Sequence, residues 1–361
     1  MKILRILKVV SINVVSFLVL LFIVNWLCGR FLKDTRATRD QLPNYEGNRD
    51  HAKAVFRDYN SLKFEYYPFV GWKALPYKGT TTTVNQQGNR EHTPPAYDSE
   101  RTQSVHFFGG STMWGEGSDD QHTIPALFNE KFPQYNVVNH GQLAYNTRQE
   151  VDALISLYSK KVVPDVVVFY DGVNDASFLC PTEINELPAH RLVPMFRNKI
   201  YVPKSAYVKE ALYKAFLENI VLLMNRYRQP AQGESPYDCI SNPAKAEEIA
   251  EMFMLNWEMA HEIVTARGGK FIAILQPAAL FGNPKTDHMK IDDDLKANFS
   301  DIYVRIQKKI AERQHPWIYD LSDVLSRDEY IYIDWCHVSP NGNEIVAENL
   351  ANIFKQMEQP G

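Results

Sequence analysis

Asp165-Val166-Val167-Val168-Phe169-Tyr170 is a short run of β-branched and aromatic residues, and Gly172 follows it closely. Such a run, ended by a turn residue, predicts a buried β-strand. Similar apolar runs occupy residues 104–108, 135–139, 270–276 and 316–320, and helical patterns cover 247–266 and 301–312. Strands that alternate with helices predict an α/β fold, here a three-layer α/β/α sandwich with a five-stranded parallel sheet.

Polar residues that can carry out chemistry lie in three segments of this pattern. Phe108-Gly-Gly-Ser-Thr112 offers a serine hydroxyl, and Asp171-Gly-Val-Asn-Asp175 offers a side-chain amide. Asp334-Trp-Cys-His337 offers a carboxylate three residues before an imidazole, just ahead of a helix start at Ser339-Pro340. Sites in open α/β sheets form outside the carboxyl ends of the strands, so we expect the three segments to meet there.

Together the three segments have the parts of a hydrolytic site. A serine is a poor nucleophile at neutral pH unless a base takes its proton, and that base needs a group to orient it. We therefore expect Ser111 to be the nucleophile, His337 the base and Asp334 its partner. The amide of Asn174 would donate to the developing oxyanion.

A second Asp-x-x-His at Asp119–His122 follows the serine loop. We interpret this copy as capping or decorating a helix that starts near Thr123-Ile124-Pro125. Each segment alone has an ordinary structural interpretation, such as a turn or a cap. Their combination, each at the end of a predicted strand or the start of a helix, favours an enzyme site.

In these segments the chain resembles the SGNH (GDSL-type) hydrolases, over about 250 residues from Ser104 to the C-terminal helix. Ser111, Asn174, Asp334 and His337 match the family's site residues, and the remaining block would be Val138–Ala144. The resemblance implies the flavodoxin-like SGNH hydrolase fold over residues 104–357, with strand order 2-1-3-4-5.

Two positions depart from the family's pattern. Gly110 stands where an aspartate often precedes the serine, and Ala144 stands where the oxyanion-hole glycine is expected. The backbone N–H of Ala144 can still donate if its φ is negative. A positive φ would move the expected donor to the vicinity of Gly141.

Other catalytic patterns are missing from the sequence. Met113 replaces the last glycine of a Gly-x-Ser-x-Gly elbow, and His261-Glu262 lacks the second histidine of a zinc protease motif. The histidines do not cluster with cysteines at metal-ligand spacing, so we expect neither a metal nor another cofactor.

The N-terminus predicts a membrane anchor over residues 1–33. Val9–Gly29 is almost continuously apolar and long enough to cross a hydrocarbon core of about 30 Å. The alternative is a buried core helix. Positive residues flank both ends of the run and do not decide its orientation: Lys2, Arg5, Lys8, Arg30, Lys33, Arg36 and Arg39. A short N-terminal tail that stays inside would place the catalytic domain outside the cytoplasm, on the periplasmic or extracellular side.

Two further regions complete the predicted organisation. Residues 34–103 form a polar, turn-rich accessory segment, with a strand of a hairpin expected at Thr80–Val84. Residues 178–245 interrupt the α/β pattern as an insertion, which would be either a substrate-shaping cap or a membrane-proximal packing element. Cys180 and Cys239 flank this insertion and would be either a disulfide or two unpaired cysteines.

The expected activity is ester hydrolysis through an acyl-enzyme, of the esterase or deacetylase type. The substrate would be an acylated cell-envelope glycan or a lipid, and a thioester also stays open. An O-acyltransferase acting on a glycan is one alternative, and a catalytically silent, membrane-tethered binding module is another. A net charge of -4 gives no basic footprint for nucleic acid, and the sequence names no protein partner.

Overall fold

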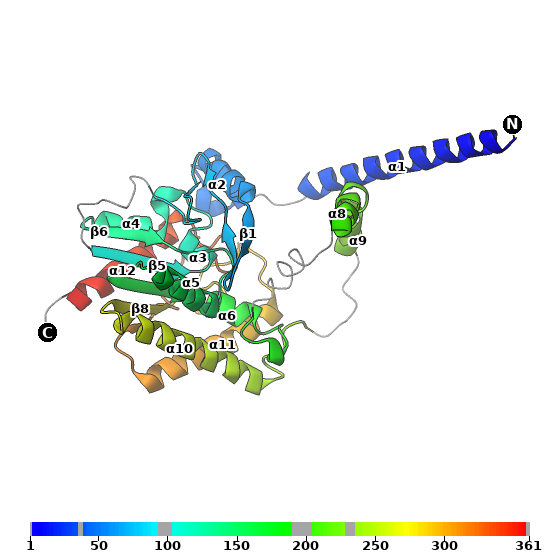
Figure 1. The fold of residues 1–361 in the computed structure, drawn as a ribbon. Helices are drawn as coiled ribbons and strands as arrows, with labels where there is room; N and C mark the ends of the chain where they lie inside the picture. The colour runs from blue at the N-terminus through cyan, green and yellow to red at the C-terminus, as the bar shows by residue number, and fades with distance from the viewer. Residues whose placement is uncertain (1, 35–38, 93–102, 190–203, 228–234, 359–361) are drawn as a thin grey trace. The chain divides into compact units, whose positions relative to one another are not determined.

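The computed structural model describes residues 2–34, 39–92, 103–189, 204–227 and 235–358. The chain forms two compact units (Figure 1). One contains the N-terminal helix and residues 197–234, and the other contains the rest of the chain.

The N-terminal part contains helices and short hairpins. The helices and 3-10 turns are α1 (Lys2–Asp34), η1 (Arg39–Gln41), η2 (Pro43–Tyr45) and α2 (Arg49–Ser61). The strands are β1 (Phe64–Tyr67), β2 (Gly71–Ala74), β3 (Tyr77–Lys78) and β4 (Thr83–Val84). β1 pairs with β2 and β3 with β4, both antiparallel. The hairpin strand predicted at Thr80–Val84 is present only at Thr83–Val84.

The part of the chain from Gln103 onward alternates strands and helices. Its strands are β5 (Gln103–Gly109), β6 (Tyr135–Asn139), β7 (Val166–Asp171), β8 (Lys270–Leu275) and β9 (Ile318–Asp320). Its longer helices are α4 (Ile124–Lys131), α5 (Thr147–Ser159), α10 (Pro243–Thr265), α11 (Asp293–Arg313) and α12 (Pro340–Glu358). Its short elements are α3 (Ser111–Trp114), η3 (Asp120–His122), α6 (Val173–Phe178) and η4 (Ile184–Glu186), and the insertion adds α8 (Lys204–Phe216) and α9 (Glu218–Tyr227).

The predicted fold class is confirmed. The five strands form one parallel sheet in the order β6-β5-β7-β8-β9, which is the expected order 2-1-3-4-5. β7 lies at its centre, where the sequence has its strongest strand signal. Three predicted starts were wrong. α10 begins at Pro243 rather than 247 and α11 at Asp293 rather than 301, because Asn242 and Asp292 cap these helices by accepting from Lys245 N and Leu295 N. β9 begins at Ile318 rather than 316.

Both faces of the sheet are covered, as the continuous apolar character of its strands requires. Side chains alternate along β7, so Val167 and Phe169 pack on one side, with α5, α10 and α11. Val166 and Val168 pack on the other side, with α4 and α12 (Figure 1). These two layers bring the turns after β5 and β7 to one edge of the sheet.

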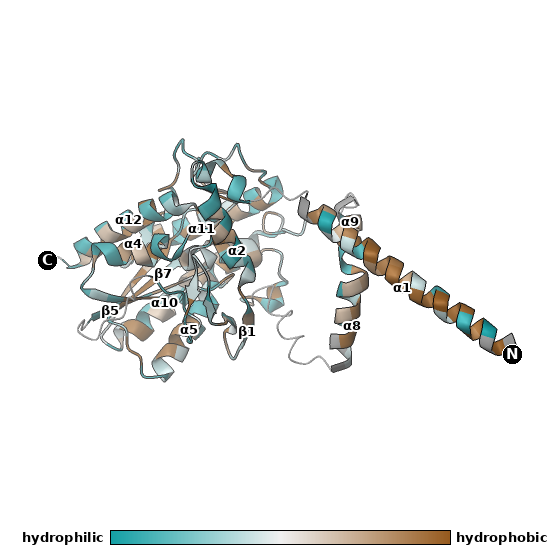
Figure 2. Ribbon diagram, turned by 90° about the horizontal axis from the view of Figure 1, so that it is seen from above, coloured by the Kyte–Doolittle hydropathy of each residue, from teal (hydrophilic) through white to brown (hydrophobic). Residues whose placement is uncertain are grey.

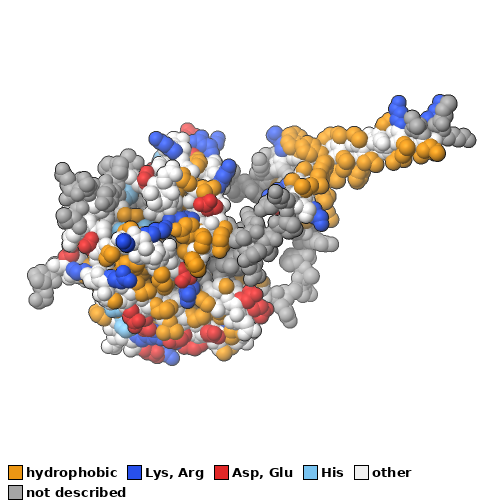
Figure 3. Space-filling model, in the orientation of Figure 1, with side chains coloured by type: hydrophobic (Ala, Val, Ile, Leu, Met, Phe, Trp, Pro, Cys, Tyr) orange, Lys and Arg blue, Asp and Glu red, His pale blue; other side chains and the backbone are white. Residues whose placement is uncertain are grey.

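The predicted apolar N-terminal helix is present as α1. Its segment Arg5–Leu32 is long and apolar enough to cross a membrane, and none of its most apolar stretch is buried within the protein. Figure 2 shows hydrophobic residues around the helix, and Figure 3 shows their side chains along its surface.

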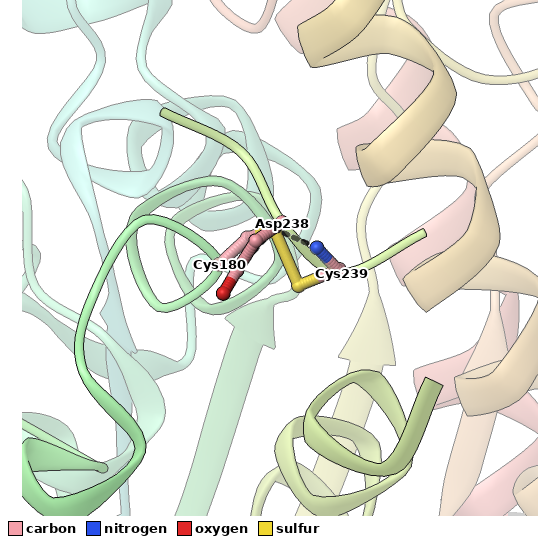
Figure 4. Close-up of side chains that lie close together, drawn as sticks. All are labelled: Cys180, Asp238 and Cys239. Atoms are coloured by element: carbon pink, nitrogen blue, oxygen red, sulfur yellow. Dashed lines mark hydrogen bonds between the residues drawn. A yellow bond between two sulfur atoms is a disulfide. The ribbon is translucent and has the colours of Figure 1, made fainter. Parts of the chain in front are cut away.

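A disulfide joins Cys180 and Cys239 at the two ends of the insertion (Figure 4). Their Cα atoms are 5.6 Å apart, and both residues are fully buried. Cys239 N–H also donates to Cys180 Sγ, at 3.1 Å. Of the two interpretations that the sequence left open, the structure has the paired one.

Candidate active site

Ser111 is the first residue of α3, and only Gly110 separates it from the end of β5. Gly110 precedes the helix in an extended conformation, and the Ser111 side chain is 8% exposed. The backbone N–H at a helix start has no partner within the helix, and no acceptor among the described residues binds the N–H of Ser111. The hydroxyl and this N–H therefore lie together at the carboxyl edge of the sheet.

His337 connects Ser111 to Asp334. Its Nε2 lies 2.6 Å from Ser111 Oγ, and its Nδ1 lies 2.8 Å and 2.9 Å from the two Asp334 oxygens. The backbone N–H groups of Cys336 and His337 also donate to Asp334 Oδ1, at 3.0 Å and 2.8 Å. The three side chains predicted from distant segments are thus in hydrogen-bond contact, in the geometry of a serine nucleophile with an oriented base.

Two charged residues that the sequence did not single out join this group. Glu116 Oε2 lies 3.0 Å from His337 Nε2. Arg39 donates to Glu116 Oε1 at 2.5 Å and to Asp334 Oδ2 at 2.9 Å, so one guanidinium bridges both carboxylates. Tyr59 of α2 donates to Glu116 Oε2 at 2.6 Å. The accessory segment therefore supplies two side chains to the active-site network.

Glu116 had a weak signal in the sequence. It stands between Gly115 and Gly117, both at a φ of +92°, which glycine adopts readily. These turns return the chain toward the start of α3, where Glu116 N–H donates to Ser111 O. Arg39 had no such signal, because it lies close in sequence to the apolar N-terminal helix and far from every motif.

The charges of the site shift one another's protonation. Burial alone would raise the pKa of Asp334, but the charge and hydrogen bond of His337 outweigh it and hold that pKa far below its usual range. Burial opposes the charged form of His337 too, yet Asp334 and Glu116 raise the pKa of the imidazole well above its ordinary value. Glu116 keeps a lowered pKa despite burial, because His337 and Arg39 stabilise its charge.

Asn174 lies in α6, directly after β7, and its amide reaches the serine turn. One N–H of its Nδ2 donates to Tyr145 O, which leaves the second N–H for another acceptor. A Cβ at Gly110 would lie only 2.3 Å from Asn174 Nδ2. A glycine before the serine therefore makes room for this amide.

In the loop 139–145, Ala144 has the positive φ for which the oxyanion donor was expected near Gly141. Ala144 has a φ of +61°, in the left-handed region. The N–H of Gly141 donates to Asn139 Oδ1 at 2.9 Å and is therefore engaged. Within the described part of the chain, the N–H of Ala144 has no acceptor.

The second Asp-x-x-His lies apart from this network. Asp119 caps η3 and binds His122 Nδ1 at 2.6 Å and His51 Nε2 at 2.7 Å. Thr123 then caps α4, by accepting from Ala126 N. Among the described residues, no hydrogen bond joins His122 to the triad.

Two groups of potential metal ligands occur among the described residues. In the first, the sulfurs of Cys180 and Cys239 are bonded to each other and are not thiolates. In the second, both His337 nitrogens contact Asp334 or Ser111, and burial raises the pKa of the Cys336 thiol to about 12. Neither donor set fits a metal ion, which requires deprotonated and available ligands.

No protein-family model matches the sequence, and a search of curated proteins gives no match. Solved structures do resemble the chain. A carbohydrate acetylesterase from Sinorhizobium meliloti is 12% identical with a TM-score of 0.41, over 71% of this chain and 100% of that one. A member of the lipolytic protein G-D-S-L family from Veillonella parvula is 12% identical with a TM-score of 0.37, over 71% and 100% of the two chains. The M. smegmatis aryl esterase is 12% identical with a TM-score of 0.37, over 71% and 99%. At these values, function has to be argued from the site itself.

Proposed function

We propose that this protein is a serine ester hydrolase that cleaves an O-acyl ester through an acyl-enzyme. The observation that carries the proposal is the continuous contact from Ser111 Oγ through His337 to Asp334. A silent binding module has no need of a nucleophile, a base and a buried carboxylate in this arrangement.

In the first step, Ser111 Oγ attacks the ester carbonyl carbon while His337 Nε2 takes the hydroxyl proton. Asp334 accepts from the other ring nitrogen, which fixes the tautomer and stabilises the imidazolium. His337 then returns the proton to the leaving alcohol. Water attacks the acyl-enzyme in a second step with the same proton transfers in reverse, and the acid product leaves.

The oxyanion is held by three donors in this proposal. They are the second N–H of Asn174 Nδ2 and the backbone N–H groups of Ser111 and Ala144. A positive φ at Ala144 was expected to move the donor to the vicinity of Gly141, and Ala144 does have a φ of +61°. The N–H of Gly141 is engaged, however, whereas that of Ala144 has no acceptor among the described residues, and this supports choosing Ala144 in this loop. Each preorganised donor contributes most when charge develops on the oxygen.

We place the substrate in the cell envelope, as an acylated glycan or a lipid ester. The apolar helix α1 supports a single-pass membrane anchor. The Cys180–Cys239 disulfide supports a catalytic domain outside the cytoplasm, because disulfides persist in oxidising compartments. Protease added to intact spheroplasts tests this orientation, because it degrades the domain only if the domain lies outside.

Labelling with a fluorophosphonate and hydrolysis of short-chain and long-chain esters test the activity. Ser111→Ala is expected to lose labelling and turnover while the protein stays folded. Turnover that persists in folded Ser111→Ala would refute the proposal. Product analysis with an added glycan acceptor separates hydrolysis from transfer, because only a transferase gives an acylated acceptor.

A further inference from the structure

The insertion helices α8 and α9 pack against α1, and one polar side chain of α1 contacts both of them. Asn25 is 3% exposed, although it stands within the apolar span. Its Nδ2 donates to Lys214 O at 2.9 Å and to Ala215 O at 3.0 Å, in the last turn of α8. Its Oδ1 accepts from Asn219 N at 2.9 Å and from Ile220 N at 3.3 Å, in the first turn of α9.

One amide thus satisfies backbone groups at both sides of the break between two helices. The last carbonyls and first N–H groups of helices have no partner inside the helix and are normally satisfied by water or caps. In a membrane no water is available, so such groups need a protein partner. An asparagine in an apolar span is also costly unless it is paired. The hydrogen bonds of Asn25 therefore satisfy the backbone groups at the helix ends and its own side-chain amide together.

Close packing surrounds this contact. A Cβ at Gly29, one turn after Asn25, would lie 2.8 Å from Asn219 Nδ2, so the glycine lets α9 approach the helix. Phe22 packs edge-on against Phe216, with ring centroids 6.2 Å apart. Small residues at the contact and a shared polar group are typical of helix packing in membranes.

The position of Asn25 along α1 gives its depth. The apolar segment Arg5–Leu32 has 28 residues, or about 42 Å at about 1.5 Å per residue, against a hydrocarbon core of about 30 Å. A centred span would extend about 6 Å beyond the core at each end, and Asn25 lies about 10 Å from the Leu32 end. The break between α8 and α9 would thus lie just inside the hydrocarbon boundary.

Apolar side chains on both insertion helices face outward. Exposed fractions are 60% for Val208 and 53% for Leu212 on α8, and 46% for Leu222 and 57% for Met224 on α9. Polar residues such as Lys209, Glu210 and Lys214 share α8, and the last two form an ion pair at 2.7 Å. Helices with apolar and charged sides are suited to the boundary between headgroups and acyl chains.

We propose that α8 and α9 lie in the interfacial layer of the bilayer beside α1, with their exposed apolar side chains against phospholipid acyl chains. The insertion is then a second membrane contact rather than a cap in water. This inference requires the membrane span of α1 but not the esterase activity.

Three matched valines test it in the full-length protein reconstituted in phospholipid nanodiscs. Val14 of α1, Val208 of α8 and Val304 of α11 are 51%, 60% and 55% exposed. Each valine is replaced by cysteine in a Cys28→Ala background, and the new cysteine is labelled with a fluorophore. Cys336 is buried and escapes labelling. Nitroxide-labelled phospholipids should quench the fluorophores at 14 and 208 severalfold more than the one at 304.

Quenching at 14 but not at 208 would overturn the inference and leave the anchor intact. No quenching at 14 would overturn the span and the inference with it. Asn25→Leu removes the four hydrogen bonds and keeps the span apolar, so trypsin should cleave at Lys209 and Lys214 faster than in the unmodified protein. An unchanged cleavage rate would overturn the docking through Asn25. Turnover of a water-soluble ester should stay unchanged and report an intact catalytic unit.

Discussion

Glu116→Gln should lower the pKa of the His337 imidazole. The substitution removes a negative charge whose oxygen lies 3.0 Å from His337 Nε2 and keeps the side-chain shape. Burial opposes the charge of this imidazole, and Asp334, Cys336 and Glu116 face it. Arg39 binds both carboxylates. With Glu116 neutralised, the imidazolium loses one of its two carboxylate partners.

The size of the effect follows from the charges. A full charge this close typically shifts a pKa by about 1–3 units, and Arg39 already offsets part of it, so we expect a fall of about 1–2 units. The base works only when neutral, and its folded pKa is raised. Wild-type activity therefore rises with pH through that raised pKa, and the variant should gain activity at lower pH. One unit below the wild-type pKa, the neutral fraction is about a tenth, so the variant should be several times faster there.

The assay is kcat/KM for a short-chain ester as a function of pH, with the histidine nitrogen NMR shift of His337 followed in parallel. Tyr59→Phe is the matched control, since it removes a hydrogen bond to Glu116 but no charge, and should shift the acidic limb less. An acidic limb and an NMR titration that both stay in place would refute the idea that Glu116 acts on His337.

Three other outcomes are expected. Asn174→Ala should lower kcat by roughly 10²–10³-fold with little change in KM, because an oxyanion donor matters once charge develops on the oxygen. A raised KM with an unchanged kcat would instead make Asn174 a substrate-binding residue. Ala144→Gly should raise the free energy of unfolding by about 1 kcal/mol, because the relief of a left-handed alanine outweighs the greater flexibility of the unfolded chain. An unchanged or lower free energy of unfolding in chemical denaturation would contradict this. Removing residues 1–33 should leave ester turnover intact. Removing residues 1–62 should abolish turnover, because Arg39 and Tyr59 are lost. Equal activity of the two truncations would show that these two side chains are dispensable.

The sheet and the contact of Ser111, His337 and Asp334 could be predicted because their signals are local. Apolar runs such as 165–170 mark strands, and strand ends in a parallel sheet meet at one edge, so Ser111 and Asn174 had to be neighbours. The Arg39–Glu116 pair could not be predicted, because no local pattern links an arginine shortly after the apolar N-terminal helix to a glutamate between glycines. The sign of φ at Ala144 could not be decided from the sequence, since the residue type alone favours a negative φ.

The Cys180–Cys239 bond makes the insertion a closed covalent ring. The bridged cysteines are 59 residues apart in sequence, and such a closure stabilises the folded state by about 4 kcal/mol through the unfolded chain. A cut inside the ring would leave both pieces tethered to the catalytic unit. The two ends also stay 5.6 Å apart whatever lies between them. The ring can therefore be shortened, lengthened or exchanged as a cassette while the strands that carry Ser111 and Asn174 keep their register.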